Sequence, residues 1–283
     1  MGGPEVTVRK ILLAGLRWPT ITTNVKDFVR ACDASQRTGK PGPKVYMLLT
    51  PHFKDRMMGE LHTQGKTIEE ISNSLKKAPL SPHTIDAIKS VHSLGCELRI
   101  ASDANLFFIE TILKHHGLVG YFSEIDTNPG YVDEEGRLRI LPYHDFTTSS
   151  HGCCLCPPNM CKGKIIERIR SSAFAEGKKR FIYLGDGKGD YCPSLELNEG
   201  DYVMPRKNYP LWELICNDPQ ALKAAIHEWS DAEELEMVLL RLIDDSVSAD
   251  LNNAAQMLSA DCKLQTIPPS SHEPLPKALP VPH

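Results

Sequence analysis

The chain has 283 residues, 41% of them hydrophobic, which is enough to bury a large core in one or two domains. Its 32 basic and 36 acidic residues leave a formal net charge of −4, so no basic field favours nucleic acid or an anionic membrane. No apolar run has the length of a membrane span, and no segment combines the hydrophobic core of a signal peptide with a cleavage site. Nine cysteines, an odd number, do not indicate a secreted disulfide framework. We therefore expect a cytoplasmic protein with mostly reduced thiols and no nucleic-acid or membrane partner.

Residues 1–50 form the least regular part of the sequence. Two short apolar runs, Lys10–Leu16 and Val45–Leu49, are separated by segments rich in threonine, glycine and proline. Val45–Leu49 could be a strand, but no acidic residue follows it. We expect an atypical N-terminal segment that is partly loop.

Helical signals begin after this segment and continue over residues 51–95. A helix-like stretch, Asp55–Gln64, stops at Gly65, and a capping box at Thr67 opens a second helix. Ser81 and Pro82 open a third helix, which ends at Gly95. These helices predict a small cap over a site, although the pattern alone weighs simple core packing equally.

The next signal is a strand that runs directly into a polar turn. Glu97–Ala101 predicts the strand, and Ser102, Asp103 and Asn105 follow it at the start of a helix. A hydroxyl, a carboxylate and an amide at a helix N-terminus can bind an anion, because the N–H groups of the first turn lack partners. The commoner alternative is that Ser102 or Asp103 only caps the helix. Downstream, the pattern predicts a strand at residues 123–126 and a hairpin over 131–141.

A cysteine-rich stretch occupies residues 151–161. Cys153, Cys154, Cys156 and Cys161 could bind zinc, with His144 or His151 nearby. The sequence has no second C-x-x-C, which favours a reduced structural loop over a zinc site. Lys162 then begins an amphipathic helix, and alone it would be an ordinary solvated lysine.

A second strand runs into a glycine-rich acidic loop. Phe181–Leu184 predicts a buried parallel strand, and the sequence Gly-Asp-Gly-Lys-Gly-Asp follows it, with carboxylates at Asp186 and Asp190. Carboxylates at this edge of an open α/β sheet suit a hard cation such as Mg²⁺. The alternative is a tight turn with two solvated aspartates. Beyond it we expect a strand at 202–205, a helix at 231–243 and a disordered, proline-rich tail over 246–283.

The order of these motifs resembles the haloacid dehalogenase superfamily of phosphatases. Ser102 after a strand, Lys162 at a helix start and the acidic glycine loop resemble its second, third and fourth motifs. Longer stretches resemble the phosphoethanolamine/phosphocholine phosphatase branch, whose plant members are described as thiamine-phosphate or pyrophosphate phosphatases: Ile100–Asn105, Pro142–Phe146, Cys156–Gly163, Gly185–Pro193 and Pro205–Lys207. The resemblance covers about residues 55–243. It implies an α/β protein with a three-layer Rossmann-like fold, a core at 96–245 and a small helical cap.

The resemblance also implies an activity, the Mg²⁺-dependent hydrolysis of a small phosphomonoester or pyrophosphate. In that activity Ser102 would hydrogen-bond the transferring phosphoryl group and Lys162 would neutralise its charge. Asp186 would bind Mg²⁺, and Asp190 would bind the metal or its waters.

The implied partner is a small phosphorylated metabolite. Asp103 and Asn105 would lie near its head group, and a carboxylate there suits choline, ethanolamine and thiamine equally, because all three are cationic. Neither the substrate nor the oligomeric state follows from the sequence.

One motif of the superfamily is missing. Its members begin with a strand that ends in Asp-x-Asp-x-Thr, whose first aspartate attacks phosphorus, but no Asp-x-Asp occurs in this chain. We identify no nucleophile, since neither Asp27 nor Asp33 follows a buried strand. Two explanations remain open: a relative that binds phosphorylated ligands without turnover, or an altered first segment from splicing or an incorrect gene model. The change in pattern near residue 50 favours the second.

Overall fold

The computed structural model describes residues 10–14, 51–175 and 180–261. Val45–Leu49, a candidate strand, lies outside these ranges, as do residues 262–283 of the expected tail. The strands are β1 (Lys10–Ala14), β2 (Glu97–Ala101), β3 (Phe122–Asp126), β4 (Gly130–Val132), β5 (Leu138–Ile140), β6 (Arg180–Gly185), β7 (Tyr202–Pro205) and β8 (Ala225–Ile226). The α-helices are α3 (Pro51–Thr63), α4 (Ile68–Lys76), α5 (Pro82–Ser93), α6 (Leu106–His115), α7 (Lys162–Ala175), α8 (Tyr191–Leu195), α9 (Pro210–Asn217) and α10 (Ala232–Asp261).

Six of the strands form one parallel sheet in the order β3-β2-β1-β6-β7-β8. β1 lies between β2 and β6, with Leu12 opposite both Leu98 and Ile182. Of the two apolar runs in the first fifty residues, Lys10–Ala14 therefore takes the middle place. Because all neighbours are parallel, the carboxyl ends of the strands share one edge of the sheet, where open α/β folds collect their ligands.

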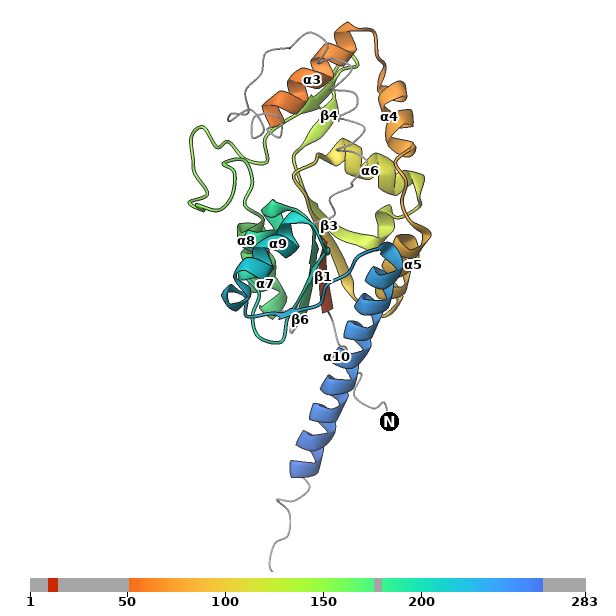
Figure 1. Ribbon diagram of the computed structural model, residues 1–283. Coiled ribbons are helices and arrows are strands. Elements are labelled where there is room, and N and C mark those ends of the chain that lie inside the picture. Colours follow the sequence, from red (N-terminus) through yellow and green to blue (C-terminus); the bar gives the residue numbers. More distant parts are fainter. Residues whose placement is uncertain (1–9, 15–50, 176–179, 262–283) are drawn as a thin grey trace, which may run out of the picture. The chain divides into compact units, whose positions relative to one another are not determined.

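Helices cover both faces of this sheet, as the sequence predicted. On β6, Ile182 and Leu184 belong to one buried cluster, whereas Phe181 and Tyr183 belong to another. This alternation places successive side chains on opposite faces, as a strand requires. Figure 1 shows α7, α8 and α9 on one side of the strands and α5, α6 and the start of α10 on the other. The result is a three-layer α/β fold.

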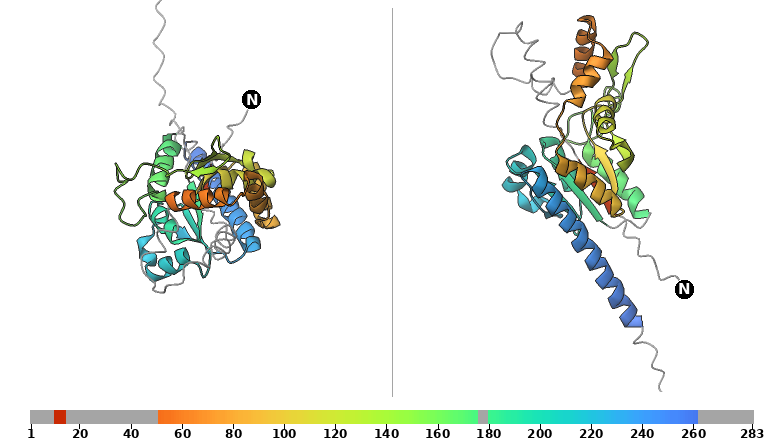
Figure 2. Two further views of the ribbon diagram at one scale, coloured as in Figure 1. Left: turned by 90° about the horizontal axis from the view of Figure 1, so that it is seen from above. Right: turned by 90° about the vertical axis from the view of Figure 1, so that its right-hand side faces the viewer.

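The predicted capping box is confirmed at the start of α4, where Glu70 N donates to Thr67 Oγ1 and Thr67 N donates to Glu70 Oε2. α3 lies beside the β4–β5 hairpin (Figures 1 and 2). Asp55 joins the two elements, since it accepts hydrogen bonds from Arg137 Nη2 at 2.9 Å and from the backbone N–H of Ile140 at 2.9 Å.

The buried face of α5 belongs to the same cluster as Leu98 of β2. Buried residues of α3 and α4 belong to this cluster too, although α3 mainly contacts β5, α4 contacts α6 and α5 contacts β2. The assignment of the whole range to a cap stays a prediction.

The chain divides into two compact units, residues 1–243 and 244–283, and α10 continues into the second. Residues 246–261 are thus helical, and the prediction of a disordered tail from residue 246 was wrong for them. The six prolines that motivated it begin only at Pro268, and Leu251, Ala254 and Leu258 keep helical spacing before it. None of the helices in the described ranges combines the length and the apolar content of a membrane span.

Candidate active site

The predicted site residues meet at the carboxyl edge of the sheet. Ser102 directly follows β2, Asp186 directly follows β6, and Lys162 is the first residue of α7. Ser102 and Asp186 are each 5% exposed and Asp190 is 1% exposed, so these polar groups lie inside the protein. A buried polar group is costly unless its partners are in place, and those partners define the site.

Asp190 accepts most of the hydrogen bonds that hold this site together. Its Oδ1 accepts from Lys162 Nζ at 2.7 Å and from Tyr183 OH at 2.8 Å. Its Oδ2 accepts from the backbone N–H groups of Asp186 at 3.1 Å and Gly187 at 2.9 Å. Both carboxylate oxygens are therefore engaged, and Asp190 fixes the loop that carries Asp186.

Gly185 makes this arrangement possible. A Cβ atom at this position would lie 2.6 Å from the Cβ of Asp190, which is too close for two carbon atoms. The loop can fold back over the end of β6 only because residue 185 has no side chain.

Lys162 is held as a cation beside this loop. Its side chain is 12% exposed, and burial alone would lower its pKa. The carboxylates of Asp190, Asp103 and Asp186 outweigh that effect and raise the pKa of Lys162 above its ordinary value. The ammonium group therefore stays charged at neutral pH, in a position that faces three carboxylates.

The turn after β2 gives its polar residues different tasks. Asn105, rather than Ser102 or Asp103, caps α6, because its Oδ1 accepts from Phe108 N at 3.0 Å. The Ser102 hydroxyl accepts from Ala104 N at 3.2 Å, so its O–H can still donate to a ligand. Asp103 is exposed at the turn.

α3 reaches this turn through a residue that sequence reasoning missed. Lys54 Nζ donates to the backbone carbonyl of Asp103 at 2.5 Å, and Asn128 Nδ2 donates to the same oxygen at 2.8 Å. Burial lowers the pKa of Lys54, and the Asp103 carboxylate opposes this effect. No local pattern marks Lys54, since it lies inside a helix and its partner is far away in the sequence.

A further buried carboxylate, Asp126, lies at the end of β3 and was also missed. Asp126 accepts from Arg168 Nη2 at 2.8 Å and from Tyr143 OH at 2.9 Å. Burial raises the pKa of Asp126 in spite of these donors, and burial together with Asp126 raises the pKa of Tyr143 to about 12. The backbone carbonyl of Asp126 accepts from Ser102 N at 2.9 Å, which joins this group to the turn after β2. Two signals were available: Asp126 ends a predicted strand, and Tyr143 lies in a stretch that resembles the family.

Four thiols gather next to the site. The sulfur atoms of Cys153, Cys156, Cys161 and Cys192 all lie within 4.8 Å of one another. Cys192 comes from α8 and was missed by the sequence reasoning, whereas Cys154 is exposed and outside the group. The pKa of Cys192 is lowered to about 6, chiefly by a hydrogen bond from the Cys156 thiol.

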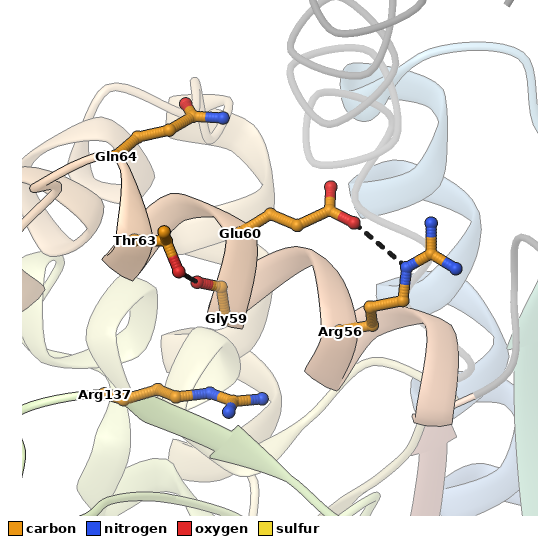
Figure 3. A pocket seen from close by; sticks show the side chains of 6 residues that line it. All are labelled: Arg56, Gly59, Glu60, Thr63, Gln64 and Arg137. Carbon is orange, nitrogen blue, oxygen red and sulfur yellow. Dashed lines mark hydrogen bonds and ion pairs between the residues drawn. The ribbon is translucent and has the colours of Figure 1, made fainter.

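A surface hollow of about 500 Å³ lies elsewhere, on α3 (Figure 3). It is lined by Arg56, Gly59, Glu60, Thr63, Gln64 and Arg137. Arg56 is paired with Glu60 at 2.9 Å. None of the predicted site residues lines this hollow.

A parallel α/β sheet with a serine, a buried lysine and an acidic glycine loop at its carboxyl edge is the arrangement that the resemblance to the haloacid dehalogenase phosphatases implied. More closely, the chain belongs to the family described as "Putative Phosphatase", whose sequence pattern matches residues 26–243. It is thus a member of a hydrolase family.

Individual relatives agree with this membership. The chain is 58% identical over 236 residues to "Inorganic pyrophosphatase 1" of Arabidopsis thaliana, covering 80% of each protein. It is 55% identical over 190 residues to the "Thiamine phosphate phosphatase-like protein" of the same plant, covering 67% of this chain and 78% of that one. The human "Phosphoethanolamine/phosphocholine phosphatase" is 31% identical over 199 residues, or 68% of this chain and 73% of that protein. The resemblance inferred from the motifs is therefore confirmed.

Proposed function

We propose that the chain is a Mg²⁺-dependent phosphatase that hydrolyses a small phosphomonoester or pyrophosphate at the carboxyl edge of the sheet. One observation carries this proposal: the Lys162 ammonium is buried, charged and held on Asp190 beside Asp186. A charged lysine and carboxylates at the same buried sheet edge offer a counter-charge for a phosphoryl group and oxygen ligands for a metal ion. The names of the relatives, which include a pyrophosphatase and phosphatases of cationic phosphomonoesters, fit this substrate class.

The side chains divide the work of holding a phosphoryl group. Phosphoryl transfer needs positive charge and hydrogen-bond donors around the equatorial oxygens. Lys162 supplies the charge and the Ser102 hydroxyl supplies a donor, from opposite sides of the sheet's middle strand. Asp190 positions Lys162 and the loop, and it does so without contacting the substrate.

The donor set fits Mg²⁺. This ion takes oxygen ligands, keeps several waters and is usually held by one or two carboxylates together with substrate phosphates. We assign Asp186 as its protein ligand, and Asp190, whose two oxygens already accept four hydrogen bonds, as a support for the loop or for metal-bound water. When bound, the ion would offset negative charge on the phosphoryl group.

A second candidate function is the binding of the same ligands without turnover. The sequence after β1 reads Gly-Leu-Arg, and the first acidic residue that follows is Asp27. Loss of a nucleophile typically costs about 10⁴-fold to 10⁶-fold in turnover. This observation favours a binding protein, so the two functions need a direct test.

The test is phosphate release by the purified chain in Mg²⁺, with phosphoethanolamine, phosphocholine, thiamine monophosphate and pyrophosphate as substrates. Turnover that falls by about 10²-fold or more in Asp186→Asn would support the phosphatase. Ligand-induced thermal stabilisation without phosphate release would support the binding protein. Neither stabilisation nor release with any of these compounds would contradict both.

A further inference from the structure

The spacing of the four gathered thiols is that of a metal site. Cys192 Sγ lies 3.6 Å from Cys153 Sγ and 3.7 Å from Cys161 Sγ, and all four sulfur atoms lie within 4.8 Å of one another. Four sulfur atoms bound tetrahedrally to zinc, with Zn–S distances near 2.3 Å, are about 3.8 Å apart. The distances from Cys192 to Cys153 and Cys161 match this separation, and no sulfur–sulfur distance in the group is greater than 4.8 Å.

Ordinary core packing does not explain this group. Cys153 and Cys156 are only partly buried, although apolar packing would bury them fully. Cys154 is next to Cys153 in the sequence, yet it is exposed and outside the group. Cys192 comes from α8 in place of Cys154. The grouping is therefore selective, and it joins residues from two distant parts of the chain.

The surroundings of the sulfur atoms suit thiolates. Lys164 N donates to Cys161 Sγ at 3.4 Å, and the backbone N–H of Gly163 donates to Cys192. Backbone donors of this kind orient metal ligands and stabilise their charge. A Cβ atom at Gly163 would lie 2.6 Å from Cys192 Sγ, so only glycine lets the sulfur approach this closely.

The loop that carries three of the thiols has no regular secondary structure to stabilise it. Residues 141–161, between β5 and α7, contain no helix or strand, and Figure 1 shows them as a long green loop. Loops of this length without regular structure are uncommon in compact domains. A structural metal contributes the binding energy that such a segment lacks.

We propose that Cys153, Cys156, Cys161 and Cys192 bind one structural Zn²⁺ ion. Binding replaces the thiol protons, which pass to the solvent, with four Zn–S bonds. Four protein ligands leave no open position for water or substrate, so this ion does not take part in hydrolysis. The site is distinct from the oxygen-donor site at Asp186 and does not rest on the proposed function.

The ion would fix the positions of Lys162 and Asp190 relative to each other. Cys161 immediately precedes Lys162, and Cys192 follows Asp190 by two residues. A zinc ion bound to both cysteines would fasten the start of α7 to the start of α8, on either side of the Lys162–Asp190 ion pair. These cysteines are positioning residues, since they do not contact the substrate.

The first test is the metal content of the full chain, purified without a chelator and measured by mass spectrometry. We expect about one equivalent of zinc per chain, and about one equivalent of Co²⁺ after exchange, with the visible absorption of a tetrahedral cobalt–thiolate site. Cys154→Ser is the matched control, because it removes the neighbouring exposed thiol and should keep the metal. Cys192→Ser should lose it.

Thiol alkylation of the unmodified chain is a second test, and it does not depend on whether a cysteine variant folds. The four proposed ligands should resist alkylation until a chelator is added and then react, whereas Cys154 reacts in both states. Cys96, which is buried away from the group, should stay protected in both states. A chain without stoichiometric zinc that also fails to take up Zn²⁺ or Co²⁺ would overturn the proposal, as would metal lost in Cys154→Ser but kept in Cys192→Ser.

Discussion

Two segments of the chain reach the carboxyl edge of the sheet from neighbouring strands. The loop after β6 is held in place by Asp190, which accepts four hydrogen bonds, one of them from Lys162. The chain that leaves β1 at Ala14 continues into Gly-Leu-Arg, with no carboxylate where the superfamily has its attacking aspartate. On the proposed function, the residues that would hold the phosphoryl group are in place after β2 and β6, whereas the sequence after β1 lacks the Asp-x-Asp that would attack it. Binding and turnover can be tested separately in this protein.

The largest expected effect comes from introducing the missing Asp-x-Asp-x-Thr motif after β1. Gly15→Asp, Arg17→Asp and Pro19→Thr together place Asp-x-Asp-x-Thr directly after Ala14. Phosphate release should rise by on the order of 10⁴-fold, because an aspartate able to act as nucleophile would then directly follow β1. The measurement is kcat/KM for the substrates named above. The matched control carries Gly15→Asn with the other two changes, and an equal rise there would contradict the comparison.

The next largest effect is expected when the ion pair between Asp190 and Lys162 is removed. Asp190→Asn leaves a buried lysine without its charged partner, so the free energy of unfolding should fall by about 3 kcal/mol. Equilibrium unfolding in urea measures this change. Asp103→Asn, at an exposed position, should change it by less than about 0.5 kcal/mol. Equal losses in the two variants would show that Asp190 does not organise the loop.

The pH dependence of phosphate binding follows from the same ion pair. The raised pKa of Lys162 means that its stabilising charge is fully present below the ordinary value of 10.5 and is lost only as pH rises through the higher, folded-state pKa. Phosphate affinity due to Lys162 should therefore hold from about pH 7 to about pH 9. Asp190→Asn removes the strongest contribution that opposes burial and leaves those of Asp103 and Asp186, so the pKa of Lys162 should fall and affinity should decline over that range by about tenfold. Calorimetric titration with phosphate checks this, and a flat profile in the variant would refute it.

The smallest expected effect concerns the choice of substrate. Asp103 is exposed at the turn after β2, so its carboxylate can attract a cationic head group only through solvent-screened charge. Asp103→Asn should weaken binding of phosphocholine or thiamine monophosphate by about fivefold and leave pyrophosphate binding unchanged. Thermal-shift titrations measure both. Equal weakening for all ligands would place Asp103 in phosphate binding instead.

Local patterns predicted much of the fold. The strand before Ser102, the strand before Gly185 and the capping box at Thr67 are each encoded within a few neighbouring residues, and all three are confirmed. The middle strand was only one of two candidates, because a five-residue apolar run carries no information about its partners. Its place depends on β2 and β6, which lie far along the chain.

The parts of the site that were missed depend on distant contacts. Cys192 joins Cys153 and Cys161 only after α8 has packed beside α7, and the sequence places it more than thirty residues away. Likewise, Arg168 reaches Asp126 from a helix that begins after the long loop. Residue type and spacing identify candidate ligands, but only the packed helices decide which of them meet.

In β1, the residues that complete the sheet can be distinguished from the residue that would attack phosphorus. The five residues of β1 complete the sheet through backbone hydrogen bonds to β2 and β6, which require strand geometry and no particular side chain. Many short sequences could serve equally well at this position, whereas only an aspartate in the right place can attack phosphorus. The place of β1 in the sheet and the residue that would attack phosphorus are therefore separate requirements on this part of the sequence.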